Sequence, residues 1–317
     1  MDNSCKSECT QASNGEPVGD LASFIKAVAA QRNQWDLATR SSVWFRGEDR
    51  DFGKQALTPR LYRQTLEHPL RDRTNFLQRE GWLFEQFRTV GAGLAHMPND
   101  PDEWQWYVLM QHHGCPTRLL DWTENALAAL YFAVRGRASQ TDQSPAVVYM
   151  LHKEIVSRHF PQPIETEKDQ YPLDRYLPLA EGDEDTSMFD DPTLIDIDHM
   201  TPRIAAQRSR FVVFGKNLQS LGERLTSGCL RGVSKISVDG NFKNIIEELR
   251  ACGTTESSIF QDLDGLGREL DAIWEQMSSE DSKLRSLPRR RRHRKTISAA
   301  AGASSSSSTM ASNTETL

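Results

Sequence analysis

Residues 111–133, QHHGCPTRLLDWTENALAALYFA, join the most polar turn of the chain to its most apolar helical stretch. In the second half, the apolar residues between 126 and 131 recur at helical spacing, and Thr123 is of a type that caps helices. In the first half, Gly114 and Pro116 are residues that end a preceding helix. The pattern predicts a polar turn between two helices.

Further elements follow from the spacing of apolar residues on either side of this turn. We expect helices near residues 21–28, 76–87, 104–113, 242–249 and 258–274. We expect strands near residues 43–46, 146–151, 211–214 and 233–238. Together they predict an α+β fold, a single domain whose small central sheet, mixed or antiparallel, is flanked by helices.

Composition sets the boundaries of that domain. Residues 1–20 form a polar leader and residues 278–317 a basic, Ser-rich tail, and we expect both to be disordered. The domain itself is expected over residues 21–277. Within it, the acidic and proline-bearing stretch from about 161 to 198 is expected to be a surface insertion or irregular structure.

Charge is distributed unevenly along the 317 residues. The tail from residue 278 holds eight Lys or Arg and three Asp or Glu, so it carries +5 and the rest of the chain −11. An acidic domain does not attract nucleic acid by default, so contacts with nucleic acid or anionic surfaces are expected from the tail alone. The run Arg289–Lys295 also suits nuclear targeting in a eukaryote, and an idle extension is the alternative.

The remaining sequence features suggest a cytoplasmic protein without a metal site. No apolar stretch approaches the length of a membrane span, and the leader lacks the features of a secretory signal. The five cysteines are scattered and are expected to stay reduced. Neighbouring histidines His112 and His113 point in different directions on a helix, so they are poor joint ligands.

A first candidate site residue is Arg46, at the end of the strand-forming run Val43–Phe45. An arginine there needs an anionic or carbonyl partner, because burying a guanidinium unpaired is costly. A phosphate or carboxylate ligand fits its planar fork of donors. An internal ion pair with a carboxylate such as Asp121 is the alternative.

Two other segments carry chemistry-bearing residues. The stretch 111–123 concentrates histidine, arginine, aspartate and threonine in a loop between rigid elements, where ligand-binding groups commonly lie. Gln207, ahead of the strand near residue 211, can orient a ligand by hydrogen bonds but is no acid or base. A buried amide bonded to the backbone is its structural alternative.

These segments resemble the FRG domain, which is named for its Phe-Arg-Gly sequence. The resemblance rests on Trp44-Phe45-Arg46-Gly47, on residues 111–123 and 129–133, on Arg203–Gln207 with Phe211, and on Ser258–Leu266, so it covers about residues 20–275. The chain departs from the usual pattern at His113, Cys115, Ser209 and Gln261. The resemblance implies an intact polar pocket in a family of largely unknown function.

A second similarity, to ADP-ribosyltransferases, concerns mechanism. An arginine closing the first core strand, a Thr-containing turn, a helix ending in Tyr-Phe-Ala and a polar residue before a later strand are similar to their layout. In that group the first-strand residue holds NAD and a late Glu assists transfer. Here Gln207 would occupy the late position.

The two resemblances imply a set of site residues. Arg46 and Arg118 would hold phosphates, and Trp122 would form an aromatic wall. The full set comprises Asp121 and Gln207 as catalytic residues and, as ligand-binding residues, Arg46, Gly47, His112, Thr117, Arg118, Trp122 and Thr123. NAD would enter as a substrate, with no metal ion.

Two functions remain open at this point. The first is a transferase-like pocket that binds NAD or another nucleotide and modifies a macromolecule. The second is a non-catalytic module for ligand sensing or protein interaction. An Asp121 carboxylate outside any ion pair with Arg46 or Arg118 favours the first.

Overall fold

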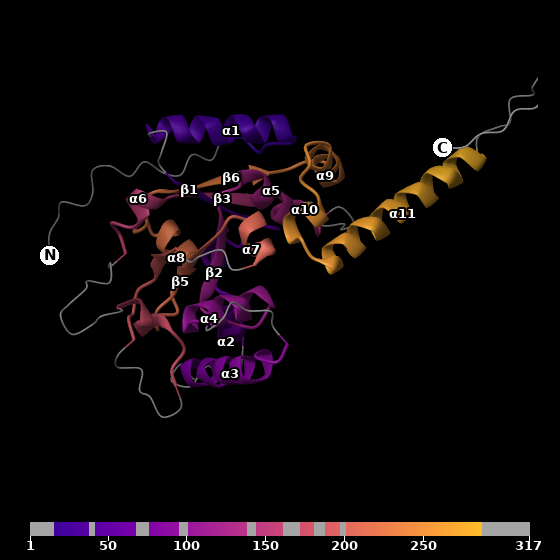
Figure 1. Ribbon diagram of the computed structural model, residues 1–317. Helices are drawn as coiled ribbons and strands as arrows, with labels where there is room; N and C mark the ends of the chain where they lie inside the picture. Colours follow the sequence, from indigo (N-terminus) through magenta and orange to yellow (C-terminus); the bar gives the residue numbers. More distant parts are fainter. Residues whose placement is uncertain are drawn as a thin grey trace, which may run out of the picture. The chain divides into compact units, whose positions relative to one another are not determined.

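The computed structural model describes residues 16–37, 42–67, 76–94, 101–137, 144–160, 172–180, 188–196 and 201–286 (Figure 1). The expectations for residues 1–15 and 287–317 lie outside these ranges, whereas residues 278–286, which were expected to be disordered, are helical. The chain divides into two compact units, Met1–Asp271 and Ala272–Leu317. In the described ranges, no helix has both the length and the apolar content needed to cross a membrane.

Six strands form one sheet in which every paired neighbour is antiparallel. The order across the sheet is β4-β5-β2-β1-β3-β6. The strands are β1 Val43–Glu48, β2 Leu119–Thr123, β3 Ala146–His152, β4 Thr193–Ile195, β5 Ser209–Val213 and β6 Val233–Val238. The expected α+β class with a central antiparallel sheet is confirmed, and β1, β3, β5 and β6 coincide with the four expected strands.

Helices occur throughout the described ranges, and those up to residue 260 lie around this sheet (Figure 1). Their bounds are α1 Leu21–Gln34, α2 Arg60–Glu67, α3 Phe76–Gly91, α4 Glu103–His112, α5 Ala126–Val134, α6 Lys153–Val156, α7 Pro202–Ala206, α8 Leu221–Thr226, α9 Phe242–Ala251, α10 Glu256–Phe260 and α11 Leu263–Ser286, with short 3-10 turns η1 Gly53–Gln55 and η2 Pro172–Tyr176. Several of these helices have an N-cap residue whose side chain accepts a hydrogen bond from a main-chain amide in the first turn. The Asp20 carboxylate accepts from the Ser23 amide at 2.7 Å at the start of α1.

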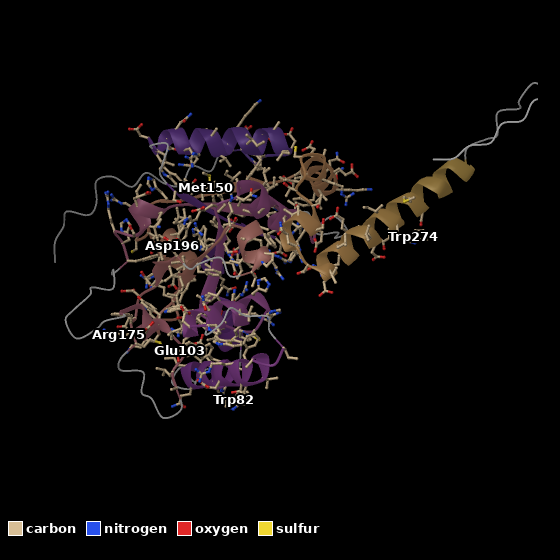
Figure 2. All side chains as sticks on the ribbon, in the orientation of Figure 1. Trp82, Glu103, Met150, Arg175, Asp196 and Trp274 are labelled. Atoms are coloured by element: carbon tan, nitrogen blue, oxygen red, sulfur yellow. The ribbon has the colours of Figure 1, made fainter. Side chains whose placement is uncertain are left out.

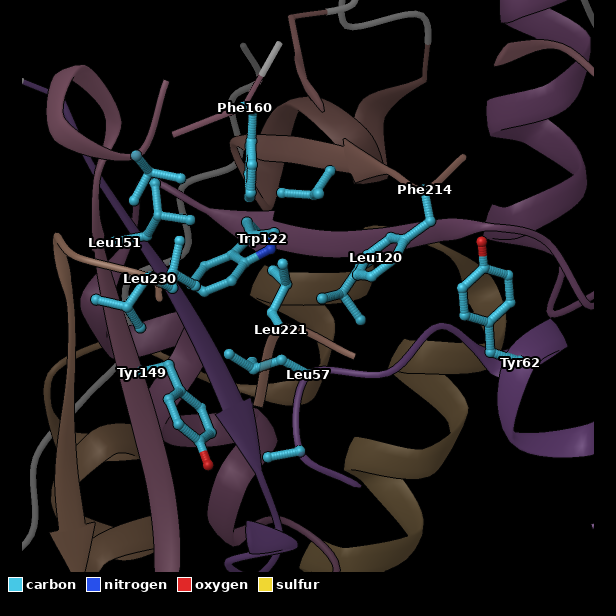
Figure 3. Packing of buried hydrophobic residues seen from close by; sticks show 14 of the residues in the cluster. Leu57, Tyr62, Leu120, Trp122, Tyr149, Leu151, Phe160, Phe214, Leu221 and Leu230 are labelled. Atoms are coloured by element: carbon cyan, nitrogen blue, oxygen red, sulfur yellow. The ribbon is translucent and has the colours of Figure 1, made fainter. Parts of the chain in front are cut away.

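Alternating side chains of each strand fill the cores on the two faces of the sheet. Trp44 and Trp122 belong to one buried cluster (Figure 3), whereas Phe45 belongs to a second cluster together with residues of α1, α5 and α9. Met150 of β3 is fully buried in the second cluster, whereas Trp82 on α3 is 63% exposed (Figure 2). The sheet is therefore covered on both faces.

The stretch 119–123 is a strand, so the expectation of a turn between two helices is wrong here. Leu119, Leu120, Trp122 and Thr123 are buried and only Asp121 is exposed, because β2 lies in the middle of the sheet between β5 and β1. A strand buried on both faces loses the polar-apolar alternation that identifies strands in sequence. The cap of α5 is accordingly Asn125, whose side chain accepts from the Leu127 amide at 3.0 Å, and not Thr123.

The acidic stretch and the leader are more ordered than expected in their described parts. Residues 172–180 and 188–196 contain η2 and the edge strand β4, and Tyr176 is 1% exposed. Val18, within the expected leader, is buried and bridges Val238 in parallel. Both segments thus contribute to the core.

The helix expected at 258–274 is two helices, and its apolar residues do not close the domain. Gln261 adopts a left-handed conformation, with φ of 46°, and separates α10 from α11. Within the first unit, Leu263 of α11 is 84% exposed and Leu270 is 55% exposed. Within the second unit, Trp274 is 69% exposed. The apolar residues at helical spacing are therefore exposed in this segment and do not form a buried face.

Strands β1 and β2 diverge, which creates a fork in the sheet. They share a single Cα register pair, Phe45 with Thr123, whereas β1 and β3 are paired along six residues. Continuing the antiparallel register would place Gly47 opposite Asp121, but these positions are not paired. The open side of the fork lies between the ends of β1 and β2 that carry Arg46 and Asp121.

Candidate functional site

A cavity of about 310 Å³ opens beside this fork. Strands β1, β2 and β5 and helices α4, α5 and α7 contribute its walls. Seven of the nine residues expected from the sequence line it, namely Arg46, Gly47, His112, Asp121, Trp122, Thr123 and Gln207. Thr117 and Arg118 do not. The volume is at the lower end of the roughly 300–1,000 Å³ typical of ligand pockets.

Arg46 reaches across the fork. Its Nη1 donates to the main-chain oxygen of Asp121 at 2.7 Å, and its Nε lies 3.3 Å from Oε1 of Glu48. The guanidinium thereby satisfies a carbonyl that a regular β1–β2 ladder would have paired. Because its side chain is still 16% exposed, part of the charge faces the cavity.

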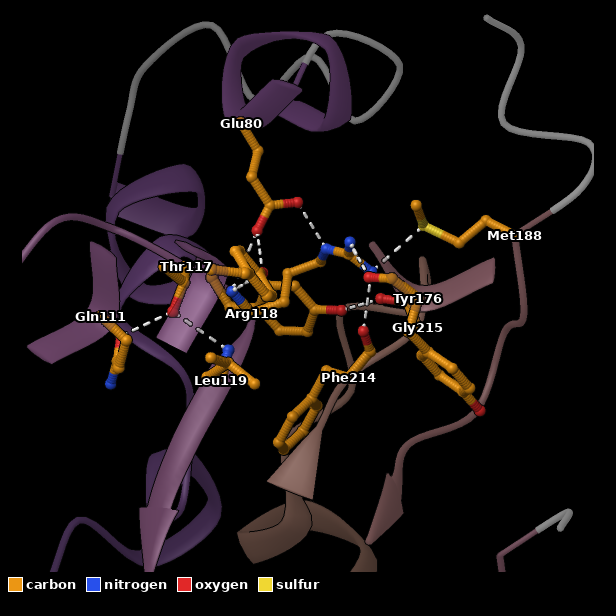
Figure 4. A network of polar contacts seen from close by, with 11 residues as sticks. Glu80, Gln111, Thr117, Arg118, Leu119, Tyr176, Met188, Phe214 and Gly215 are labelled. Atoms are coloured by element: carbon orange, nitrogen blue, oxygen red, sulfur yellow. Dashed lines mark hydrogen bonds and ion pairs between the residues drawn. The ribbon is translucent and has the colours of Figure 1, made fainter. Parts of the chain in front are cut away.

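The carboxylate of Asp121 has no ion-pair partner among the described residues. Its Oδ2 accepts from Nε2 of Gln111 at 2.6 Å, and Gln111 in turn accepts through Oε1 from the Thr117 hydroxyl at 2.5 Å. Figure 4 shows the link between Gln111 and Thr117. Thr117 is fully buried, so it acts on the pocket through Gln111 and does not reach a ligand directly.

Arg118 lies in the protein interior and is fully buried together with Glu80 (Figure 4). Its Nε donates to Oε2 of Glu80 at 2.6 Å, and its other nitrogens donate to the main-chain oxygens of Phe214 and Tyr176 at 2.8 and 2.6 Å. The expected phosphate contact is therefore not available to this side chain, whose donors are used inside the fold.

Trp122 and Thr123 touch the cavity but have other partners. The indole of Trp122 packs in the core cluster with Leu120 (Figure 3), so it forms no wall for a ligand. The Thr123 hydroxyl donates to the main-chain oxygen of Gln207 and accepts from the Asn125 amide at 2.9 Å. The Thr123 hydroxyl thus joins the end of β2 to Gln207, two residues before β5.

Gln207 offers an unused donor. Its Nε2 is buried without a hydrogen-bond partner in the described part of the chain, and the residue lines the cavity. A buried amide left unsatisfied costs about 1–3 kcal/mol, which a ligand oxygen would offset. The backbone-bonded alternative for this side chain is thus not what the geometry shows.

His112 is an uncharged member of the lining at neutral pH. Burial, followed by the positive charges of Arg203 and His113, lowers the pKa of its imidazole to about 4. The positive charge at the cavity wall therefore comes from Arg46 and Arg203. A neutral imidazole can still donate one hydrogen bond and accept another.

Three of the other lining residues have a polar or aromatic role in the site that the expected set did not include. Gln111 holds Asp121, Arg203 brings a second guanidinium, and Phe132 supplies an aromatic surface that Trp122 does not. Gln111 and Arg203 stand inside the motifs that carried the FRG resemblance, which was the available signal. Phe132 also belongs to a segment of that resemblance, residues 129–133.

Replacing Thr117 by valine is expected to lower the free energy of unfolding by about 1–3 kcal/mol, since the buried Leu119 amide and Gln111 oxygen lose their hydroxyl partner. Urea denaturation followed by circular dichroism measures this. Thr117→Ser keeps the hydroxyl and is the matched control. Equal losses in the two variants would show that the hydroxyl contributes nothing.

Fold and site together define an α+β domain with a polar pocket at a fork in an antiparallel sheet. Residues 41–142 match the FRG domain, so this part of the chain is an FRG domain. The match includes β1, α4, β2 and α5, whereas α7 and Gln207 lie beyond it. No curated protein and no solved structure matches the chain.

Proposed function

We propose that this pocket binds NAD and transfers its ADP-ribosyl part to a macromolecule, in the manner of ADP-ribosyltransferases. One observation carries the proposal: the backbone of Asp121 holds Arg46 in the fork, while the carboxylate of Asp121 stays outside any ion pair in the described ranges. An anion-binding group and a free carboxylate thus belong to one wall.

ADP-ribosyl transfer would use both the negative charge of Asp121 and the positive charge of Arg46. The glycosidic bond between nicotinamide and the ribose breaks, and its electron pair leaves with nicotinamide. The sugar carbon becomes positively charged in the transition state, and a nucleophile of the acceptor bonds to it and releases its proton. A carboxylate such as Asp121 stabilises that positive charge, and Arg46 holds the phosphate side.

The cavity accommodates the reacting half of such a ligand. A volume of about 310 Å³ suits a nicotinamide-ribose unit, with the remainder extending outward. Phe132, which is only partly buried, provides apolar surface for a flat ring, and the free Nε2 of Gln207 suits a ribose hydroxyl or amide oxygen.

Gln207 supports the second candidate function, a ligand sensor that binds the same molecule without turnover. An amide carries no negative charge, so it cannot replace the late Glu of the transferases in stabilising the transition state. In that case NAD binding persists and no nicotinamide is released.

Calorimetric titration with NAD, together with a nicotinamide-release assay, tests the proposal. The wild type is expected to bind NAD and release nicotinamide. Asp121→Asn is expected to bind NAD within about threefold of the wild type but to release nicotinamide about 100-fold more slowly, as for loss of one transition-state contact. Glu247→Gln, an exposed residue on α9 with the same change in charge, is the control.

Each other outcome has a defined meaning. Binding without release in the wild type supports the sensor and overturns the transferase. Release that is unchanged in Asp121→Asn removes the carboxylate from the mechanism. A folded wild type that does not bind NAD overturns both candidate functions.

A further inference from the structure

Arg203, on α7, is an arginine in the cavity wall that makes no hydrogen bond to the described part of the chain through its side chain. Its side chain is 27% exposed, and its Nε is buried with no partner in the described ranges. The nearest carboxylate oxygen, Oδ2 of Asp262, lies 3.8 Å from Nη1, beyond hydrogen-bond distance. A guanidinium has five N–H donors, and here none of them has an acceptor among the residues that the structure describes.

Arg46 and Arg118, the two arginines that the sequence suggested for the site, differ from Arg203. Arg118 donates to Glu80 and to two main-chain oxygens, and Arg46 donates to Asp121 and Glu48. Every side-chain nitrogen of Arg118 therefore has a partner inside the fold, whereas Nη2 of Arg46 has none in the described part of the chain. Arg203 is the lining arginine whose donors are all available, which is the condition for binding an anion by a planar, two-point contact.

The ring of Phe260 holds Arg203 in place without using its donors. The Cζ atom of Arg203 lies 4.4 Å from the ring centroid, and those of Arg135 and Arg268 lie 4.8 and 5.0 Å from it. Contact with an aromatic face orients a guanidinium and leaves its edge free. The sharp turn at Gln261 directly follows Phe260 and so fixes the end of α10.

The surroundings of Arg203 favour an incoming negative charge. Glu256 contacts both Arg268, at 2.6 Å, and Arg135, at 3.9 Å, so its charge is shared between them. Burial is the largest cause of the lowered pKa of Arg203. The carboxylates of Asp262 and Asp121 act in the opposite direction, whereas the positive charges of Arg135 and Arg268 lower the pKa further. An anion bound to the guanidinium would offset the cost of desolvating its charge and its repulsion from Arg135 and Arg268.

We propose that Arg203 is a phosphate-binding group and that the ligand of this pocket carries a diphosphate, which Arg46 in the fork and Arg203 on α7 hold from two sides. This rests on the proposed function and deepens it by naming the phosphate subsite. It also assigns to Arg203 the role that the sequence had suggested for Arg118.

Titration calorimetry with three probes tests the subsite: ADP-ribose, inorganic pyrophosphate and nicotinamide riboside, which has no phosphate. Arg203→Gln is expected to weaken ADP-ribose and pyrophosphate by about 10- to 100-fold, the effect of losing a charged hydrogen bond, and to leave nicotinamide riboside within about twofold. Arg203→Lys keeps the charge but loses the two-point contact, so an intermediate loss is expected.

Arg208→Gln is the matched control, because Arg208 is exposed just after α7 and does not line the cavity. Thermal transitions establish that the variants are folded. If Arg203→Gln fails to fold, the affinity of Arg203→Lys for ADP-ribose decides, because lysine keeps the charge but not the two-point contact. An affinity within about twofold of the wild type overturns the subsite.

The remaining outcomes separate the subsite from the proposed function. ADP-ribose affinity that is unchanged in Arg203→Gln overturns the subsite. An equal loss of affinity for nicotinamide riboside also overturns it, because the contact of Arg203 would then not depend on phosphate. Pyrophosphate binding that depends on Arg203, in a protein that does not bind NAD, supports the subsite and overturns the proposed function. Binding of none of the probes overturns both.

Discussion

Glu80→Ala is expected to lower the free energy of unfolding by about 3–5 kcal/mol, because it leaves the fully buried charge of Arg118 without its carboxylate. The carboxylate also accepts from the Arg118 amide at 3.1 Å and from the Tyr107 hydroxyl, so three donors lose a partner together. Against a total stability of roughly 5–15 kcal/mol, this is the largest effect of any single change considered.

Chemical denaturation of the full chain measures the loss, and Glu85→Ala on the same helix is the matched control. Glu85 pairs with Arg88 at 2.8 Å, but both side chains are well exposed, so a change of less than about 1 kcal/mol is expected. Adding Arg118→Met to Glu80→Ala is expected to recover part of the loss. A Glu80→Ala protein within 1 kcal/mol of the wild type would contradict the assignment of Arg118 as a structural residue.

Gly47→Ala is expected to destabilise the domain by about 3 kcal/mol, at the upper end for overpacking. A Cβ at residue 47 would lie 2.0 Å from the main-chain oxygen of Ala129 and 2.7 Å from the main-chain nitrogen of Ala133. Both atoms belong to the backbone of α5, which cannot turn aside as a side chain can. The helix must therefore move away from β1.

Denaturation midpoints of Gly47→Ala and Gly136→Ala compare a crowded glycine with an open one. No atom of the described residues lies within 4 Å of a Cβ at residue 136, so a change within about 0.5 kcal/mol is expected there. Equal midpoints for the two variants would show that α5 shifts freely. Because Gly47 and Ala129 both line the cavity, ligand binding to a folded Gly47→Ala protein is expected to weaken as well.

The sequence predicted the fold class because four of the strands are short apolar runs. It did not predict β2, whose Asp121 and Thr123 resemble turn residues and whose neighbours include Gly114 and Pro116. The strand exists because β5 and β1 are on either side of it, and those partners lie far away in sequence. Local pattern carries no information about such pairing.

The site was predictable as a set of residues but not in its division of labour. Arg46, Asp121 and Gln207 do line one cavity. Whether Arg118 or Arg203 faces that cavity depends on which of them meets a buried carboxylate, and the partner of Arg118 stands 38 positions earlier, on α3. Contacts over that distance in sequence are set by packing.

The fork has a mechanical consequence. On one side of it β4, β5 and β2 form a continuous ladder, and on the other side β1, β3 and β6 form another. Among the described residues, the two ladders share one backbone register pair, Phe45 and Thr123. Rotation of one ladder against the other about that pair would change the width of the cavity while each ladder kept its own register. The hydrogen bond from Arg46 to the main-chain oxygen of Asp121 spans the opening of the fork and would resist that rotation.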